Sequence, residues 1–243
     1  MMAEDVKNAV YEYGDLEQRT ARRPVVSTPY EQEICRHMET VFPGRTMRVY
    51  REIDSEFLHV DVFVMQAPTK QDFHVLYTTG MSALPMTLPA ELLPQYRDLE
   101  RAELLLLLPA EWDILTGYEE DKDVPDRLWW PVRLMKYLAR FPHEYKTWLG
   151  WGHTLPNSEA FVPYDESTKL CGAMLGALQE RISVYRAEDD TQINLYTVMP
   201  LYREEMEYQK TAGTEALMQK LAALKGFGMI VFPDRPNVCE AEE

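Results

Sequence analysis

The sequence predicts an α+β fold. We expect a mostly antiparallel or mixed β-sheet core with a few packed helices, including a long C-terminal helix. Several candidate strands lie close together before the first long helix, and a second group of strands separates it from a long C-terminal amphipathic segment. Strands and helices that occur in separate runs are typical of α+β domains. Hydrophobic residues make up 46% of the 243 residues, enough for a substantial core.

The N-terminal part begins with a polar helix or arm over residues 1–26, followed by a domain expected over residues 27–235. In this domain a helix is expected to start near Thr28, a possible N-cap, and to end before Pro43 and Gly44. Apolar residues alternate with others over residues 57–65, which is typical of a strand with one buried face. The expected strands of this part are residues 46–53, 57–65, 73–79 and 101–108.

The run over residues 101–108 is apolar on nearly both faces, so we expect a central strand that is covered on both sides. An acidic loop follows over residues 113–127, and Pro131 is expected to start a helix that ends near residue 140. Arg133, Lys136 and Arg140 form a basic face on that helix. The remaining expected elements are strands 168–175, 181–187, 192–199 and 229–232, a helix over 200–225 and an acidic tail over 236–243.

The charge balance limits the classes of partner. The formal net charge is −15, from 25 basic and 40 acidic side chains, and such a field repels the phosphates of nucleic acids. The same field attracts a basic protein partner, although high charge also simply keeps proteins soluble. No apolar run approaches the ~20 residues of a membrane span. The three cysteines, Cys35, Cys171 and Cys239, are far apart and predict a reduced, cytoplasmic protein without a disulfide framework.

No motif of an enzyme or of a cofactor site stands out, so we expect no catalytic residues, no bound metal and no cofactor. Ser82 follows a strand and Gly80, as a nucleophile does at a tight turn, but the sequence implies no base beside it. His59, Asp61 and His74 are a possible metal set on neighbouring strands, or simply the hydrated face of the sheet. Geometry decides between these alternatives.

The segment after the basic helix face is unusually aromatic. It contains side chains of the types enriched at binding hot spots, followed by the glycines of a turn. Aromatic residues also fill protein cores, so the segment is either interface or core. With the basic face, the candidate binding residues are Arg133, Lys136, Arg140, Phe141, His143, Tyr145, Trp148, Trp151 and His153. We expect Trp148 to be more buried than Trp151 and His153.

Several segments together resemble the suppressor of fused family in its compact bacterial form. They include HVDVFVMQA from His59, LYTTGMSALPM from Leu76, RAELLLLLPAEW from Arg101, WPVRLMKYLARFPHEYKTWLGWGHTLPN from Trp130, TKLCGAML from Thr168 and VMPLYREEMEYQKTAGTEALMQKL from Val198. The resemblance implies a non-enzymatic domain that binds a protein or peptide. In the animal proteins, a peptide adds to sheet edges in a cleft between two domains, and the matching stretch here runs from Phe141 to His153. We expect this chain to lack the second domain, and the resemblance implies that an aspartate of that cleft is replaced near Trp151.

Three functions remain as hypotheses from the sequence. Bacterial relatives are proposed to be immunity proteins, and an acidic immunity protein is suited to neutralise a basic toxin domain. A peptide-binding regulatory module that uses β-augmentation is the alternative, and it predicts an exposed sheet edge beside Trp148 to His153. A hydrolase or metal enzyme of another type is the third, and it requires a pocket with convergent titratable groups.

Overall fold

The fold is that of a computed structural model, which describes residues 28–53, 55, 57–116, 124–224 and 229–240. The expected N-terminal arm and the end of the acidic tail lie outside these residues. A single mixed sheet runs through the described part in the order β1-β2-β3-β4-β8-β6-β5, and β7 pairs with β8 beside it. The neighbouring strands are antiparallel except for β4 and β8, which are parallel. This arrangement agrees with the predicted α+β class.

The first half of the sheet contains the four expected strands, some with shorter bounds, but the strand expected over residues 57–65 begins at Asp61 and is buried on both faces rather than on one. Strands β1 (Met47–Tyr50), β2 (Asp61–Met65) and β3 (Phe73–Thr79) form an antiparallel meander that ends on β4 (Ala102–Pro109). Every residue of β4 is buried. Leu106 belongs to one core cluster and Leu107 to another, so β4 is covered on both faces, as expected for a central strand.

The second half of the sheet is centred on β8 (Gln192–Leu201), which pairs with β4 on one side. On its other side it pairs with β7 (Val184–Arg186) and β6 (Gly172–Gly176). The short strand β5 (Thr154–Pro156) pairs with β6 and ends the sheet. The expected strand 181–187 is partly wrong, because α4 (Glu180–Ser183) replaces its first residues. The expected strand 229–232 is a single bridge between Ile230 and Leu107.

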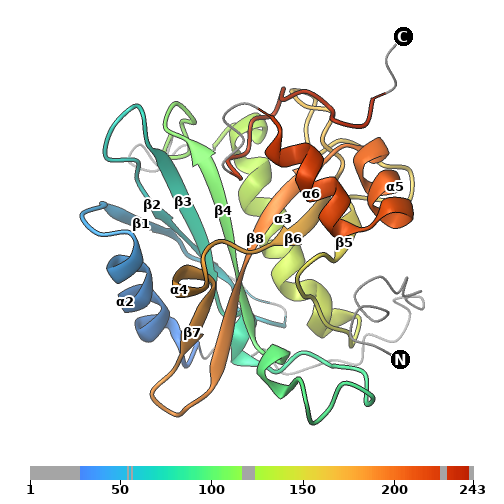
Figure 1. Cartoon of the computed structure of the whole chain (residues 1–243). Helices are drawn as coiled ribbons and strands as arrows, with labels where there is room; N and C mark the ends of the chain where they lie inside the picture. The colour runs from blue at the N-terminus through green and yellow to red at the C-terminus, as the bar shows by residue number, and fades with distance from the viewer. Residues whose placement is uncertain (1–27, 54, 56, 117–123, 225–228, 241–243) are drawn as a thin grey trace.

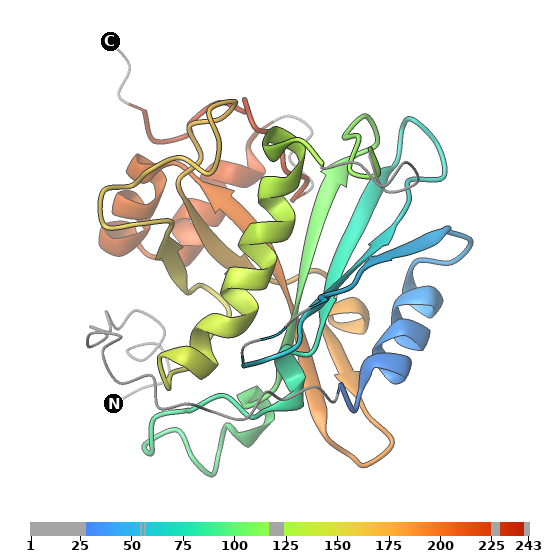
Figure 2. The same cartoon turned by 180° about the vertical axis from the view of Figure 1, so that it is seen from behind.

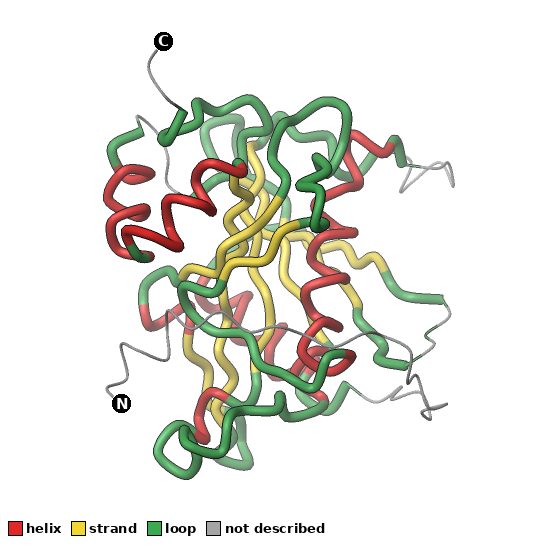
Figure 3. The backbone as a smooth tube through the Cα atoms, turned by 90° about the vertical axis from the view of Figure 1, so that its right-hand side faces the viewer, coloured by secondary structure: helices red, strands yellow, loops and turns green. Residues whose placement is uncertain are grey.

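Helices cover both faces of the sheet, which gives three layers (Figures 1 and 2). Helix α3 (Asp126–Glu144) lies across one face, and its buried residues join the larger core cluster with alternate residues of β2 and β4. Helices α2 (Glu31–Val41), α5 (Arg203–Ala212) and α6 (Thr214–Ala222) lie on the opposite face. Figure 3 shows the sheet edge-on between α3 and the α5–α6 pair.

Two helix predictions need correction. The first long helix starts at Asp126 rather than at Pro131, and Pro131 lies inside it. Pro125, just outside the helix, is its N-cap. The expected long C-terminal helix over residues 200–225 is wrong, because β8 runs to Leu201 and the helical stretch that follows is broken at Gly213. Gly213 has φ +90°, a left-handed conformation that glycine adopts without strain, so the chain changes direction there.

Candidate functional site

The predicted aromatic segment leads from the end of α3 to β5. Phe141, His143 and Trp148 are buried, with exposed fractions of 5%, 6% and 5%. Trp151 and His153 are half-buried, so Trp148 is the most buried of the three residues compared in the sequence, as expected. The segment therefore divides into an inner part that packs in the core and an outer part, around Trp151, that reaches the surface.

The inner part of the segment fastens α3 to the sheet. Phe141 stacks on Tyr145 with ring centroids 4.6 Å apart. The Nε2 atom of His143 lies 3.0 Å from the carbonyl oxygen of Met81, in the turn that follows β3. Aromatic stacking and a satisfied buried polar group are features of core packing. These side chains thus hold the end of α3 in place.

The outer part forms a tight turn directly before β5. Gly152 has φ +82°, and its N–H donates to the carbonyl oxygen of Leu175 at 2.7 Å. The ring of His153 lies edge-on to Trp148, with centroids 4.4 Å apart. Burial lowers the pKa of His153 to about 4, and a hydrogen bond with the backbone of Trp148 only partly opposes this effect. His153 is therefore a neutral aromatic side chain at neutral pH.

The predicted basic face of α3 is engaged within the protein. Arg133 pairs with Asp126, with 2.5 Å between Nη1 and Oδ1. Arg140 forms an ion pair with Glu52, and the Nζ atom of Lys136 lies 4.0 Å from the same carboxylate. Burial lowers the pKa of Lys136, and the charge of Glu52 opposes this change. The structure thus brings Lys136 and Arg140 together with Glu52, whereas Arg133 pairs with Asp126.

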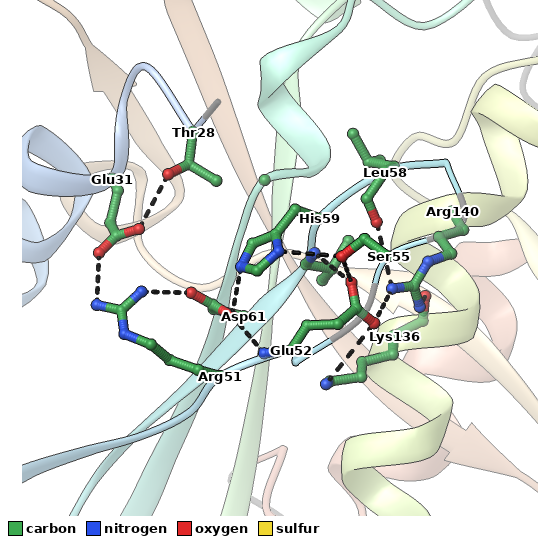
Figure 4. Close-up of polar contacts among 12 residues, drawn as sticks. Thr28, Glu31, Arg51, Glu52, Ser55, Leu58, His59, Asp61, Lys136 and Arg140 are labelled. Atoms are coloured by element: carbon green, nitrogen blue, oxygen red, sulfur yellow. Dashed lines mark hydrogen bonds and ion pairs between the residues drawn. The ribbon is translucent and has the colours of Figure 1, made fainter. Parts of the chain in front are cut away.

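Glu52 belongs to a polar clasp, which we define as Arg51, Glu52, Ser55, His59 and Asp61 around the loop from β1 to β2 (Figure 4). The fully buried Asp61 accepts hydrogen bonds from Arg51 at 2.6 Å and from the backbone N–H of Glu52 at 2.8 Å. The Nε2 atom of His59 lies 2.9 Å from Asp61. Arg51 also reaches Glu31 of α2, at 3.1 Å. The clasp therefore joins α2, β2 and α3 through two adjacent residues that follow β1.

Ser55, His59 and Asp61 are the residue types of a nucleophile, a base and an orienting acid, but their hydrogen bonds differ from those of a catalytic triad. The hydroxyl of Ser55 lies 3.0 Å from Nδ1 of His59 and donates to Glu52 at 2.7 Å. Burial alone raises the pKa of Glu52, but hydrogen bonds from Ser55, the Val60 N–H and Arg140 outweigh it and hold this pKa below its usual value. A carboxylate with a low pKa is a weak base, so this contact orders the loop without activating Ser55.

The possible metal set of His59, Asp61 and His74 is not assembled. Asp61 is paired with Thr79 at one end of β3, whereas His74 is at the other end of that strand. His74 accepts a hydrogen bond from the N–H of Ala67 through Nδ1 and lies 3.1 Å from the Ala110 carbonyl through Nε2. In the part of the chain that the structure describes, no group of three or more metal-binding side chains converges.

Ser82, the other candidate nucleophile, is buried beside a carboxylate that the sequence did not point to. Its hydroxyl and its N–H both donate to Glu103, at 2.6 and 2.9 Å. Thr78 and the N–H of Gly80 donate to the same carboxylate. Ser82 is 2% exposed and Glu103 is fully buried, so these groups hold the turn after β3.

A surface groove lies elsewhere, between residues 160–171, the start of α5 and residues 233–240, and none of the predicted site residues lines it.

The chain is thus a three-layer α+β domain in which one mixed sheet ends beside an aromatic turn. It belongs to the suppressor of fused family, because the family model described as Suppressor of fused protein (SUFU) matches residues 58–236. An uncharacterised protein of Ureaplasma parvum is 26% identical over 161 residues, which cover 66% of this chain and 70% of that protein. Among the described residues, no helix is long and apolar enough to cross a membrane.

Solved structures of the family share the fold at low sequence identity. A protein of Neisseria gonorrhoeae described as a suppressor of fused homologue has a TM-score of 0.60 and 13% identity, over 87% of this chain and 98% of that one. A chain of the Sufu-Fu complex has a TM-score of 0.61 and 15% identity, over 89% and 93% of the two chains. Drosophila Suppressor of Fused has a TM-score of 0.57 and 12% identity, and the match covers 87% of this chain but 51% of that protein.

The clasp generates a prediction about stability. Glu52→Gln should lower the free energy of unfolding by about 2–3 kcal/mol at pH 7, because it leaves Lys136 and Arg140 facing a neutral group. The folded-state pKa of Glu52 is depressed, so its contribution is present above the unfolded pKa of about 4.3 and is lost as the pH falls through the folded value. Urea unfolding of both proteins at pH 7 and pH 3 should show a smaller difference at pH 3.

Glu207→Gln is the matched control for this prediction. Glu207 pairs with Arg203 at 2.7 Å on the surface of α5, and both side chains are more than half exposed. Its loss should change the free energy of unfolding by less than about 0.5 kcal/mol. Equal effects of the two substitutions at pH 7 would contradict the assigned role of Glu52.

Proposed function

We propose that this chain is a non-enzymatic protein-binding module that captures an extended segment of its partner at the edge of β5. The observation that carries this proposal is the position of β5 at the end of the sheet, directly after Trp151 and His153. An extended peptide that adds to a sheet edge gains main-chain hydrogen bonds, and nearby side chains give specificity. The similar fold of the Sufu chain in the Sufu-Fu complex supports a protein as the kind of partner.

The hydrogen bonds between β5 and β6 indicate which groups face outward. His153 accepts from the N–H of Leu175 at 2.9 Å, and the N–H of Asn157 donates to Cys171 at 2.7 Å. Because bonded pairs alternate along an antiparallel ladder, the backbone groups of Thr154 and Pro156 point away from β6. Proline has no N–H, so the outward donor of β5 is the N–H of Thr154. A partner strand would therefore be centred on Thr154.

The finer proposal for the partner is a basic toxin domain, with this chain as its immunity protein in the cytoplasm. The net charge of −15 supports it, since an acidic surface speeds the encounter with a basic protein. The polar pairs of the α3 face also support it, because their cations are already neutralised and do not repel such a partner.

The edge proposal is tested with Thr154→Pro. This change removes the outward N–H but none of the hydrogen bonds between β5 and β6, and proline is tolerated on edge strands. Peptides are selected from a random display library on the wild-type protein. We expect the selected peptides to bind Thr154→Pro at least about tenfold more weakly, since a backbone hydrogen bond and the fit of the strand are both lost. The control is Thr154→Val, which keeps the N–H and loses the same hydroxyl contact with Gln209 as Thr154→Pro does, so the difference between the two variants reports the N–H. Equal binding to Thr154→Pro and the wild type would refute the edge.

Trp151 and Trp148 give a second prediction about the same surface. Trp151→Ala should weaken peptide binding by roughly 2 kcal/mol, with little change in the temperature of unfolding, because a partly exposed anchor contributes mainly to binding. Trp148→Ala should instead lower the free energy of unfolding by about 3–5 kcal/mol, because Trp148 is buried. Calorimetric titration and thermal unfolding measure the two effects. A Trp151→Ala protein that melts far lower yet binds normally when folded would argue against the site.

The immunity role predicts a basic toxin domain encoded by a neighbouring gene. Co-expression of this chain should restore growth of cells that produce the toxin. The affinity of the purified pair should fall several-fold between about 50 and 200 mM salt, because charge attraction is screened over a Debye length of about 10 Å at 0.1 M. Continued toxicity with no complex formed would remove the immunity role but would leave the edge proposal to its own test.

A further inference from the structure

The break between α5 and α6 places two polar side chains beside the turn that precedes β5. Gln209 is in the last turn of α5, and Thr214 is the first residue of α6. Gly213 lies between the helices with φ +90°, and its N–H donates to the carbonyl oxygen of Gln209 at 2.8 Å. A continuous helix would carry residue 214 onward along the axis of α5, so the break is what lets both side chains face the turn.

Gln209 and Thr214 bind the residues on both sides of His153. The Nε2 atom of Gln209 donates to the carbonyl oxygen of Gly152 at 3.1 Å and to Oγ1 of Thr214 at 3.0 Å. The hydroxyl of Thr214 donates to the same carbonyl at 3.4 Å. The hydroxyl of Thr154 donates to Oε1 of Gln209 at 3.3 Å. Each donor hydrogen of this set has an acceptor within it, and the Gly152 carbonyl oxygen accepts twice, so the group is a complete network.

The network is enclosed and leaves no room for a larger residue. Gln209 is 6% exposed and Thr214 is 5% exposed. A Cβ atom at Gly152 would lie 2.7 Å from Oγ1 of Thr214, and the φ of +82° also favours glycine there. Buried polar networks in which every group is satisfied make the local structure rigid. The turn at Gly152 is therefore held in one conformation.

We propose that Gln209 and Thr214 are positioning residues, which fix the β5 edge in the conformation that a partner strand requires. They hold Gly152 and Thr154, the residue whose N–H points outward from the sheet. An edge that is already ordered loses less conformational entropy when a strand binds, so the affinity is higher. The role in partner binding rests on the proposed function, whereas the effect on the order of β5 is a property of the isolated protein.

The experiment uses two conservative variants of the full chain. Gln209→Met keeps the length of the side chain and Thr214→Val keeps its shape, and both remove the hydrogen bonds. Gln219→Met and Thr211→Val, at exposed positions of α6 and α5, are the controls. Hydrogen exchange should become about tenfold faster at the amides of Gly152 and His153, which donate to Leu175 and Gly150, in the two test variants. Exchange in β3 and β4 should stay unchanged, because opening is local. The display-selected peptide should bind these variants about tenfold more weakly.

The possible outcomes separate this inference from the proposed function. Unchanged exchange at Gly152 and His153 would overturn the positioning role, as would faster exchange spread over the whole sheet. Faster local exchange with unchanged peptide affinity would also overturn it, while peptide binding at β5 stands. If the library yields no peptide dependent on the Thr154 N–H, the proposed function fails, and hydrogen exchange alone decides whether Gln209 and Thr214 order the edge.

Discussion

The candidate edge depends on one buried carboxylate in the centre of the sheet. Glu103 of β4 accepts hydrogen bonds from Thr78, from the N–H of Gly80 and from both donors of Ser82. Burial raises the pKa of Glu103, and these hydrogen bonds oppose that rise. A buried carboxylate is tolerated only where such donors surround it, so the turn after β3 has little freedom.

The turn after β3, which Glu103 holds in place, contacts both the clasp and the end of α3. Gly80 has φ +112°, and a Cβ atom there would lie 2.0 Å from the carbonyl oxygen of His59. The turn is therefore packed against the residue that supplies the imidazole of the clasp. On its other side, the carbonyl oxygen of Met81 meets His143 at the end of α3. The direction in which the aromatic segment leaves α3 thus follows from a contact that begins in the middle of the sheet.

The parts of the fold that could be predicted from the sequence are those set by local pattern. The leucines of β4 are apolar on both faces, and the structure covers both faces. The break at Gly213 could not be predicted, because the apolar residues on either side keep a helical spacing and only the φ of one glycine separates two helices. Gln209 and Thr214 had no signal of their own, since their role depends on a turn about 60 residues earlier in the chain.

The basic face of α3 shows why residue type alone does not predict which groups a charged side chain contacts. Arg133, Lys136 and Arg140 have the spacing of a binding surface, and the pattern says nothing about the acids that meet them. Lys136 and Arg140 meet Glu52, which comes from the loop after β1, far away in the sequence. The sequence groups His59 and Asp61 with His74, whereas the structure places Asp61 and Ser55 beside His59 and His74 elsewhere. Tertiary contacts between distant residues decide both cases.

The length and sequence of β5 favour selective binding over non-specific pairing with other strands. Open edge strands pair with other chains without discrimination, and proteins limit this by short strands and by proline. β5 has both features, as a three-residue strand that ends with Pro156. A strand this short offers few main-chain hydrogen bonds, and these contribute little affinity alone. Binding must therefore draw on neighbouring side chains such as Trp151. Under the proposed function, a partner that satisfies Thr154 but not the aromatic turn would be held weakly, so the edge would discriminate by the side chains beside it.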